Sequence, residues 1–234
     1  MTTTARPDHL AHFAADAAAV AAVLQTAPLD AAVPACPGWA LRDLAVHLGY
    51  VHRWALSCVR TGEPVRAGKT PVADDDLADW FDEGAQALPA ELATTDPERA
   101  CWTFAGPGTV AFWRRRVAVE TAVHRVDAQS ASGRARAVPD DLAEDGVAEV
   151  IEMFLPRQIG RGRTSVPTTG ATLVAADSGR TWQLGAVPPT ATLTGPASAL
   201  LLLLWRRLAR TDPVFTVTGE LDALDRLLAH ALTP

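Results

Sequence analysis

The segment Val110–Ser130 reads VAFWRRRVAVETAVHRVDAQS, and its apolar residues recur at the spacing of a long amphipathic helix. Because an α-helix turns by about 100° per residue, Glu120, His124 and Asp127 share one strip of that helix. Trp113 lies on the same broad side, so we expect the strip to face the interior. Burying these polar groups costs on the order of several kcal/mol unless each finds a partner. A metal ion is one such partner, since zinc is commonly bound by His and Glu.

A second helix supplies a further candidate ligand. Residues 41–59 (LRDLAVHLGYVHRWALSCV) place His47 on an apolar stripe, so its imidazole is expected to point inward. His52 lies about 140° away around a regular helix and cannot reach the same ion. Catalytic zinc sites usually have three protein ligands and one open position. The pattern therefore predicts a metal site made of His47, Glu120 and His124.

Simpler interpretations of these residues stay open. A single inward histidine is often a hydrogen-bonded core residue, and a Glu–His pair four residues apart is often solvated. Asp127 would then only hold an arginine, and the run 114–116 would be an exposed face with one salt bridge. Cys36 lies in a Pro-Ala-Cys-Pro-Gly-Trp turn with no adjacent base, which favours a packed thiol over a nucleophile. The coincidence of several titratable groups on two apolar faces favours the metal.

Composition excludes several classes of protein. A hydrophobic content of 48% with 21% charged residues predicts a packed globular chain. A net charge of −6 argues against broad nucleic-acid binding. Three widely spaced cysteines do not form a disulfide framework. The aliphatic run 197–205 is too short to cross a bilayer, and no basic-then-apolar leader opens the chain, so we expect a cytoplasmic protein without a membrane partner.

After residue 160 the sequence pattern changes from helical periodicity to a mixture of strand and helix patterns. Helices are expected over 8–24, 40–60, 74–92, 110–131 and 139–155, with a loop over 95–109 and a linker at 160–167. Strands are expected over 169–176, 180–184, 190–194 and 214–218, with helices over 196–208 and 220–232. We predict an α+β two-domain protein: an up-down helical bundle over residues 1–158 and a small α+β domain over 165–234.

These motifs resemble the mycothiol-dependent maleylpyruvate isomerase family, among the DinB-like metal-binding helical bundles. Residues 33–54 (VPACPGWALRDLAVHLGYVHRW) resemble its Pro-Gly-Trp turn and following helix with an inward histidine. Residues 113–127 (WRRRVAVETAVHRVD) resemble its Glu-x-x-x-His helix with a trailing Asp. Residues 141–156 resemble the helix that closes the bundle, and 196–208 and 217–228 resemble parts of a small, sterol-carrier-like α+β domain.

The resemblance implies residue roles by position. It places a zinc triad on His47, Glu120 and His124, with Asp127 as an acidic residue near the metal that orients a ligand or carries a proton. Arg207 falls on an arginine expected to bind a substrate carboxylate. Arg206 replaces the glycine of the family's usual Trp-Gly-Arg stretch, which leaves the choice between the two arginines open.

The resemblance also implies mycothiol as a thiol cosubstrate and a small electrophile as substrate. The reaction is then either cis–trans isomerisation by reversible addition of the thiol or S-transfer to the electrophile. The alternatives are a metal- or ligand-binding stress protein without catalysis and a thiol-independent, metal-assisted hydrolase. A monomer and a homodimer are both compatible with the sequence.

Overall fold

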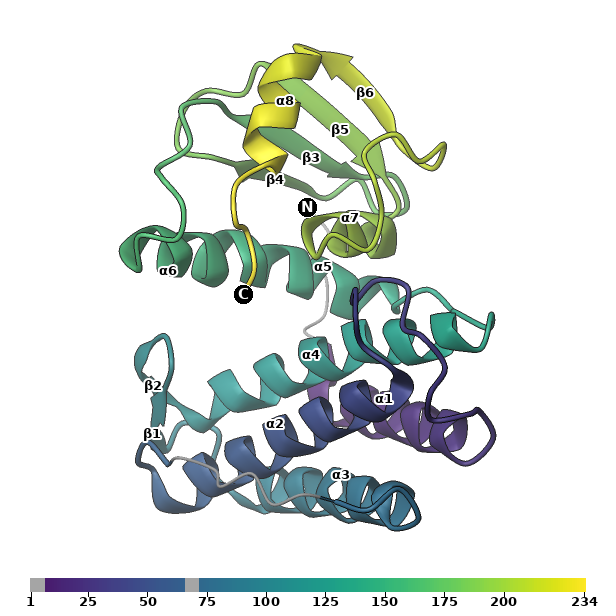
Figure 1. The fold of residues 1–234 in the computed structure, drawn as a ribbon. Coiled ribbons are helices and arrows are strands. Elements are labelled where there is room, and N and C mark those ends of the chain that lie inside the picture. The colour runs from purple at the N-terminus through teal and green to yellow at the C-terminus, as the bar shows by residue number, and fades with distance from the viewer. Residues whose placement is uncertain (1–6, 66–71) are drawn as a thin grey trace. The chain divides into compact units, whose positions relative to one another are not determined.

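The chain forms two compact units, which Figure 1 shows as ribbons. The computed structural model describes residues 7–65 and 72–234. The units divide between Arg136 and Ala137, earlier than the expected boundary between residues 158 and 165. The difference arises because the helix after residue 139 packs against a helix of the second unit, at 197–204. The expected order, a helical part followed by a small α+β part, is confirmed.

The described part of the first unit contains four helices. They are α1 (His9–Leu24), α2 (Leu41–Thr61), α3 (Leu77–Thr94) and α4 (Val110–Ala131). Helix α1 packs against α3 and α4, and α2 packs against the same two helices. Their core consists of large apolar side chains that are almost fully buried, among them Phe13, Leu44, Leu48, Phe81, Leu88 and Trp113.

Local chemistry sets the ends of the helices that carry the site. Asp43 accepts a hydrogen bond from the backbone N–H of Ala40 at 2.9 Å and so satisfies a free donor at the start of α2. Helix α2 ends at Thr61 and is capped by Gly62, whose φ of +75° is the left-handed conformation that glycine adopts without strain. The observed bounds of α4 agree with the expected helix over 110–131.

A short hairpin occupies the segment that we expected to be a loop over 95–109. Strands β1 (Ala100–Thr103) and β2 (Gly106–Thr109) pair antiparallel directly before α4. Each strand has four residues, and β2 contains glycine and proline, so the sequence carries no long alternating run that would indicate a strand. The hairpin packs against α2 and α4.

The second unit combines helices with a four-stranded mixed sheet. It starts with α5 (Asp140–Glu149), the π-helical turn η1 (Val150–Phe154) and α6 (Leu155–Gly160), where a single helix was expected over 139–155. Pro156 has no N–H to donate, so a regular α-helical ladder cannot run through this point. The remaining elements are β3 (Ala171–Ala175), β4 (Thr181–Leu184), β5 (Ala191–Gly195), α7 (Ala197–Leu204), β6 (Thr216–Gly219) and α8 (Leu221–Leu228).

The sheet has the order β4-β3-β5-β6. Strands β3 and β5 run parallel, with Leu173 opposite Leu193, and both outer strands pair antiparallel with them. Helix α7 packs against α5 and β3, while α8 packs against β3 and β5. Within the described residues, no helix combines the length and apolarity that a bilayer crossing requires.

Candidate metal centre

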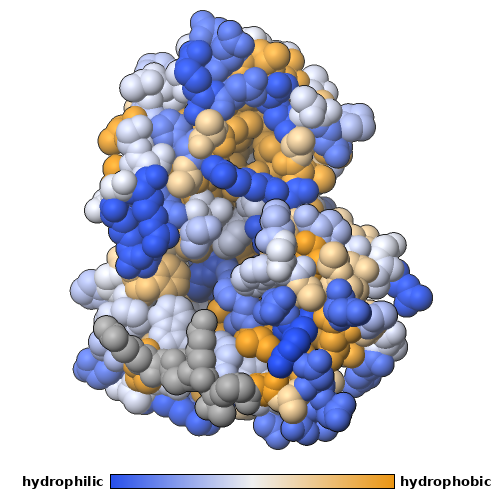
Figure 2. Space-filling view, viewed as in Figure 1, coloured by the Kyte–Doolittle hydropathy of each residue, from blue (hydrophilic) through white to orange (hydrophobic). Residues whose placement is uncertain are grey.

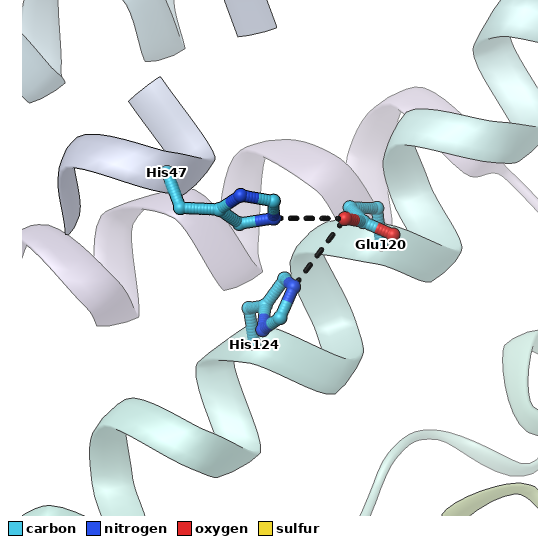
Figure 3. A group of neighbouring side chains, drawn as sticks. All are labelled: His47, Glu120 and His124. Atoms are coloured by element: carbon cyan, nitrogen blue, oxygen red, sulfur yellow. Dashed lines mark hydrogen bonds and ion pairs between the residues drawn. The ribbon is translucent and has the colours of Figure 1, made fainter. Parts of the chain in front are cut away.

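Three side chains from two helices of the first unit converge on one point. His47 comes from α2, and Glu120 and His124 come from α4; Figure 3 shows the three pointing toward one another. Oε1 of Glu120 lies 3.4 Å from Nε2 of His47 and 3.3 Å from Nε2 of His124. One ligand atom of each residue lies within 4.8 Å of the other two. The packing of α2 against α4 thus brings the three predicted ligands together.

The site is buried on one side and open on the other. The side chains of His124 and Glu120 are 7% and 13% exposed, whereas that of His47 is 38% exposed. A small molecule can therefore approach from the His47 side, while α4 closes the opposite side. Such a half-open arrangement suits a catalytic metal, which keeps a coordination position free for a ligand.

Asp127 holds His124 in its orientation. Its Oδ2 lies 2.9 Å from Nδ1 of His124, and the Asp127 side chain is fully buried. An N–H on Nδ1 that donates to this carboxylate leaves Nε2 as the atom that faces Glu120, which is the arrangement of metal-bound histidines in proteins. Oδ2 of Asp127 also lies 3.8 Å from Sγ of Cys36, so this thiol lies near the site rather than only in a turn.

Arg116 is a site residue that the sequence reasoning missed. Its Nη2 lies 2.5 Å from Oε2 of Glu120, so the carboxylate has one oxygen on an arginine and the other toward the two imidazoles. One interpretation of the run 114–116 is an exposed face with one salt bridge, yet Arg116 is buried. The four-residue spacing of Arg116 and Glu120 on one helix was the available signal.

The charges of these groups are mutually stabilising. Burial alone would raise the pKa of Glu120, but the charge of Arg116 and hydrogen bonds from the imidazoles hold that pKa well below its usual value. Burial disfavours a charge on His124, but hydrogen bonds with Asp127 and Glu120 outweigh it and raise its pKa to about 9. The site therefore stabilises positive charge next to Glu120, as a cation site must.

The donor set fits zinc. Two imidazole nitrogens and one carboxylate oxygen are among its commonest ligands, and the carboxylate behind His124 supplies the outer support that such ligands usually have. Other groups able to hold a metal, in clusters of three or more, do not occur in the described part of the chain.

His52 and Arg125 lie away from the triad and have structural partners. As expected from its position on α2, His52 does not join the three; its Nε2 lies 3.0 Å from Oγ1 of Thr121 in the core. Arg125 is also buried, and its Nε donates to Oδ1 of Asp16 at 2.9 Å. Helix α4 is therefore covered on most sides, because α1 packs where a single amphipathic face would predict solvent.

Arg206 and Arg207 lie in the second unit, just after α7. Arg206 adopts a φ of +61° and donates from Nη2 to the carbonyl oxygen of His230 at 3.0 Å. Nη1 of Arg207 donates to the carbonyl oxygen of Trp205 at 2.7 Å. Their predicted role toward a substrate carboxylate stays a prediction.

A pocket of about 1090 Å³ opens beside His47 in the first unit. Helix α2 contributes most of its wall, including His47, and Trp39 and Trp102 contribute further parts. The pocket gives His47 its exposure and offers space for a small molecule next to this imidazole.

Comparison with known proteins agrees with this combination of helical site and α+β unit. Residues 10–129 match the family described as "Mycothiol maleylpyruvate isomerase N-terminal domain", and residues 141–226 match the "MDMPI C-terminal domain". No curated protein sequence matches the chain.

Two solved structures share the fold. One is the crystal structure of the mycothiol-dependent maleylpyruvate isomerase, with a TM-score of 0.70 at 15% identity. The other is a variant of that enzyme with one histidine replaced by alanine, with a TM-score of 0.71 at 14% identity. Each comparison covers 94% of this chain and 98% of the other.

The fold and the site define a two-unit protein in which a helical unit with a His-Glu-His cluster precedes a small α+β unit. Since the two family matches together cover most of the sequence, the chain belongs to the mycothiol maleylpyruvate isomerase family.

Proposed function

We propose that this chain is a zinc-dependent enzyme that uses a low-molecular-weight thiol, mycothiol, to act on a small electrophile. The observation that carries the proposal is the convergence of Nε2 of His47, Oε1 of Glu120 and Nε2 of His124 within 4.8 Å of one another. Membership of a family named for mycothiol supports the choice of thiol.

His47, Glu120 and His124 would hold the zinc ion. When bound there, zinc supplies a positive charge that lowers the pKa of a thiol entering its open position. The chain's own residues prepare that position. Asp127 accepts a hydrogen bond from the N–H on Nδ1 of His124 and so keeps Nε2 free as a ligand atom. Arg116 keeps Glu120 ionised and fixes one of its oxygens.

The chemistry has two forms that share their first step. The sulfur of the thiol forms a bond to one carbon of an activated double bond, and the π electron pair moves to the neighbouring carbon. In an isomerisation, rotation about the resulting single bond and expulsion of the sulfur restore the double bond in the trans form. In an S-transfer by addition, the S–C bond remains and the proton lost by the thiol ends on the neighbouring carbon.

The first test is zinc content together with thiol-dependent turnover. We expect about one zinc per chain in the wild type, and its loss in His47→Ala and Glu120→Ala. His230→Ala and Glu83→Ala are matched controls, since His230 lies in the second unit and the Glu83 side chain is 77% exposed; both should keep the metal.

Turnover of a cis alkene should require mycothiol and should disappear with the zinc. Zinc retained in both His47→Ala and Glu120→Ala would overturn the assignment of these residues as zinc ligands. Zinc binding without thiol-dependent turnover would overturn the enzyme and favour a metal-binding protein, and zinc-dependent cleavage of an ester without any thiol would favour a metal-assisted hydrolase.

A further inference from the structure

Helix α2 presents a second side-chain face that does not enter the core. Every third or fourth residue on this face lines the pocket beside the triad: Asp43, Val46, His47, Tyr50, Val51 and Trp54. The core face of the same helix carries a different set, including Leu44, Leu48 and Ala55, each almost fully buried. A helix with two apolar faces, one in the core and one on a pocket, indicates that the pocket face binds something apolar.

Aromatic rings form much of the pocket wall. The ring of Trp54 lies 6.0 Å from that of Trp102 and 5.9 Å from that of Phe104, with the last pair stacked. Nε1 of Trp54 already donates to the carbonyl oxygen of Val65 at 2.9 Å, so this ring offers its apolar surface rather than a hydrogen bond. On the face of the helical unit that Figure 2 shows, pale and orange residues lie exposed among the blue hydrophilic ones.

One end of this wall reaches the metal ligands. The ring of Trp39 lies 5.2 Å from the imidazole of His47, and that imidazole lies 5.1 Å from the ring of His124. A molecule that covers the aromatic wall therefore has one end next to the three converging ligand atoms. The pocket is placed to hold the body of a substrate whose reactive carbon meets the thiol.

The charges around the pocket disfavour an anion. Asp43 lines it, and neither lysine nor arginine occurs among the lining residues in the described ranges 7–65 and 72–136. Arg116, the cation beside the triad, is paired with Glu120. An anionic group lying along the α2 wall would face the Asp43 carboxylate and would lose its hydration against apolar rings.

We propose that the electrophile accepted here is a neutral molecule with an apolar, aromatic-sized body, and not a dicarboxylate. This inference rests on the proposed function and assumes its thiol and its metal. What it adds is the class of substrate. Maleylpyruvate, named in the titles of the structural neighbours, carries carboxylates, so the inference separates this chain from them by substrate charge. The bond changes are those of the addition and expulsion described above.

A pair of dyes with the same ring system tests the pocket without turnover. N-phenyl-1-naphthylamine is neutral, and 8-anilino-1-naphthalenesulfonate carries one negative charge. We expect the zinc-loaded protein to bind the neutral dye at least tenfold more tightly, measured by the rise in dye fluorescence. Equal or tighter binding of the sulfonate would overturn the proposal.

Two variants locate the bound dye and the source of the charge effect. Val46→Glu should lower the affinity for the neutral dye at least fivefold. Ala18→Glu, at an exposed position of α1, should leave that affinity unchanged. Asp43→Asn retains an oxygen that can cap α2, and it should raise the affinity for the sulfonate dye about threefold. The exposed Asp79→Asn should not change that affinity. Unchanged binding in Val46→Glu, with zinc content preserved, would show that the dye binds elsewhere and would contradict the proposal.

Turnover separates this inference from the proposed function. Dimethyl maleate and maleate share one cis double bond and differ in charge. With mycothiol, and with each rate divided by its uncatalysed rate, we expect kcat/KM for the diester to exceed that for the dianion at least tenfold. A preference for maleate would reject the inference and leave the proposed function standing. No turnover of either compound would reject the proposed function, and the dye comparison would then decide the ligand class of the pocket by itself.

Discussion

Nδ1 of His124 lies 2.9 Å from Oδ2 of Asp127, one helical turn further along α4. Both residues are buried, so water cannot replace this hydrogen bond without a cost in free energy. The pair therefore fixes which nitrogen of His124 faces the converging ligand atoms, and it links the orientation of the site to the regular geometry of one helix.

Replacing Asp127 tests this link. Asp127→Ala removes the acceptor for Nδ1 and should weaken zinc binding about 10- to 100-fold, the usual effect of removing such a partner. Asp127→Asn keeps an oxygen acceptor, so its zinc affinity should fall less than that of Asp127→Ala. Zinc affinity can be measured by competition with a chromophoric chelator. The exposed Asp79→Asn serves as control, and equal affinity in wild type and Asp127→Ala would contradict the orienting role.

Arg116 should matter for stability as well as for the site. Arg116→Met leaves Glu120 largely buried without its arginine, which should lower the free energy of unfolding of the metal-free protein by about 3 kcal/mol. Urea unfolding monitored by circular dichroism measures this. Arg134→Met, at an exposed position, should change the value little. A loss as small as that of the control would mean that the imidazoles alone stabilise the carboxylate.

His52 should make stability depend on pH. Burial is the largest cause that lowers its pKa, to about 3, so the folded chain keeps His52 neutral while the unfolded chain protonates it below about pH 6.5. The unfolded state then binds more protons, and stability falls as the pH falls from that value toward 3. Between pH 7.5 and pH 5 the contribution of His52 should drop by roughly 2 kcal/mol.

The variant His52→Leu isolates this contribution. It loses the hydrogen bond to Thr121 at every pH, but it lacks the titrating group. The unfolding free energy of the metal-free wild type should therefore decline more steeply with acid than that of the variant. Parallel declines in the two proteins, measured by urea unfolding at both pH values, would show that His52 is not the source.

Gly49 should not tolerate a methyl group. In most helices Gly→Ala stabilises by up to about 1 kcal/mol. Here a Cβ on Gly49 would lie 2.2 Å from the ring of Trp80, which also has the guanidinium of Arg53 over it at 4.0 Å. Gly49→Ala should therefore destabilise the protein by about 1–3 kcal/mol. Gly160→Ala, where no described atom lies within 4 Å of the added Cβ, is the matched control. A rise in melting temperature in Gly49→Ala would contradict the packing argument.

Helical periodicity accounts for the parts of the fold that were predicted well. The bounds of α4 and of the central strands β3 and β5 agree with the expected ranges to within a residue or two, because α4 is a long helical pattern and both strands alternate between buried and half-buried positions. The hairpin β1–β2 was missed because strands of four residues with glycine and proline carry too little pattern. The π-helical turn was missed because Pro156 indicates a break in the α-helical ladder but a π-turn beside it leaves no distinct periodicity.

The sequence alone determined which groups could share a face. The spacing of Glu120, His124 and Asp127 on one helix follows from 3.6 residues per turn, and the inward direction of His47 follows from the apolar stripe around it. Only the tertiary structure decided that α2 and α4 meet with Nε2 of His47 3.4 Å from Oε1 of Glu120, and that Arg116 turns inward to pair with the same carboxylate. The physical reason is that helix geometry is fixed by local hydrogen bonds, whereas the contact between two helices depends on how all their side chains pack together.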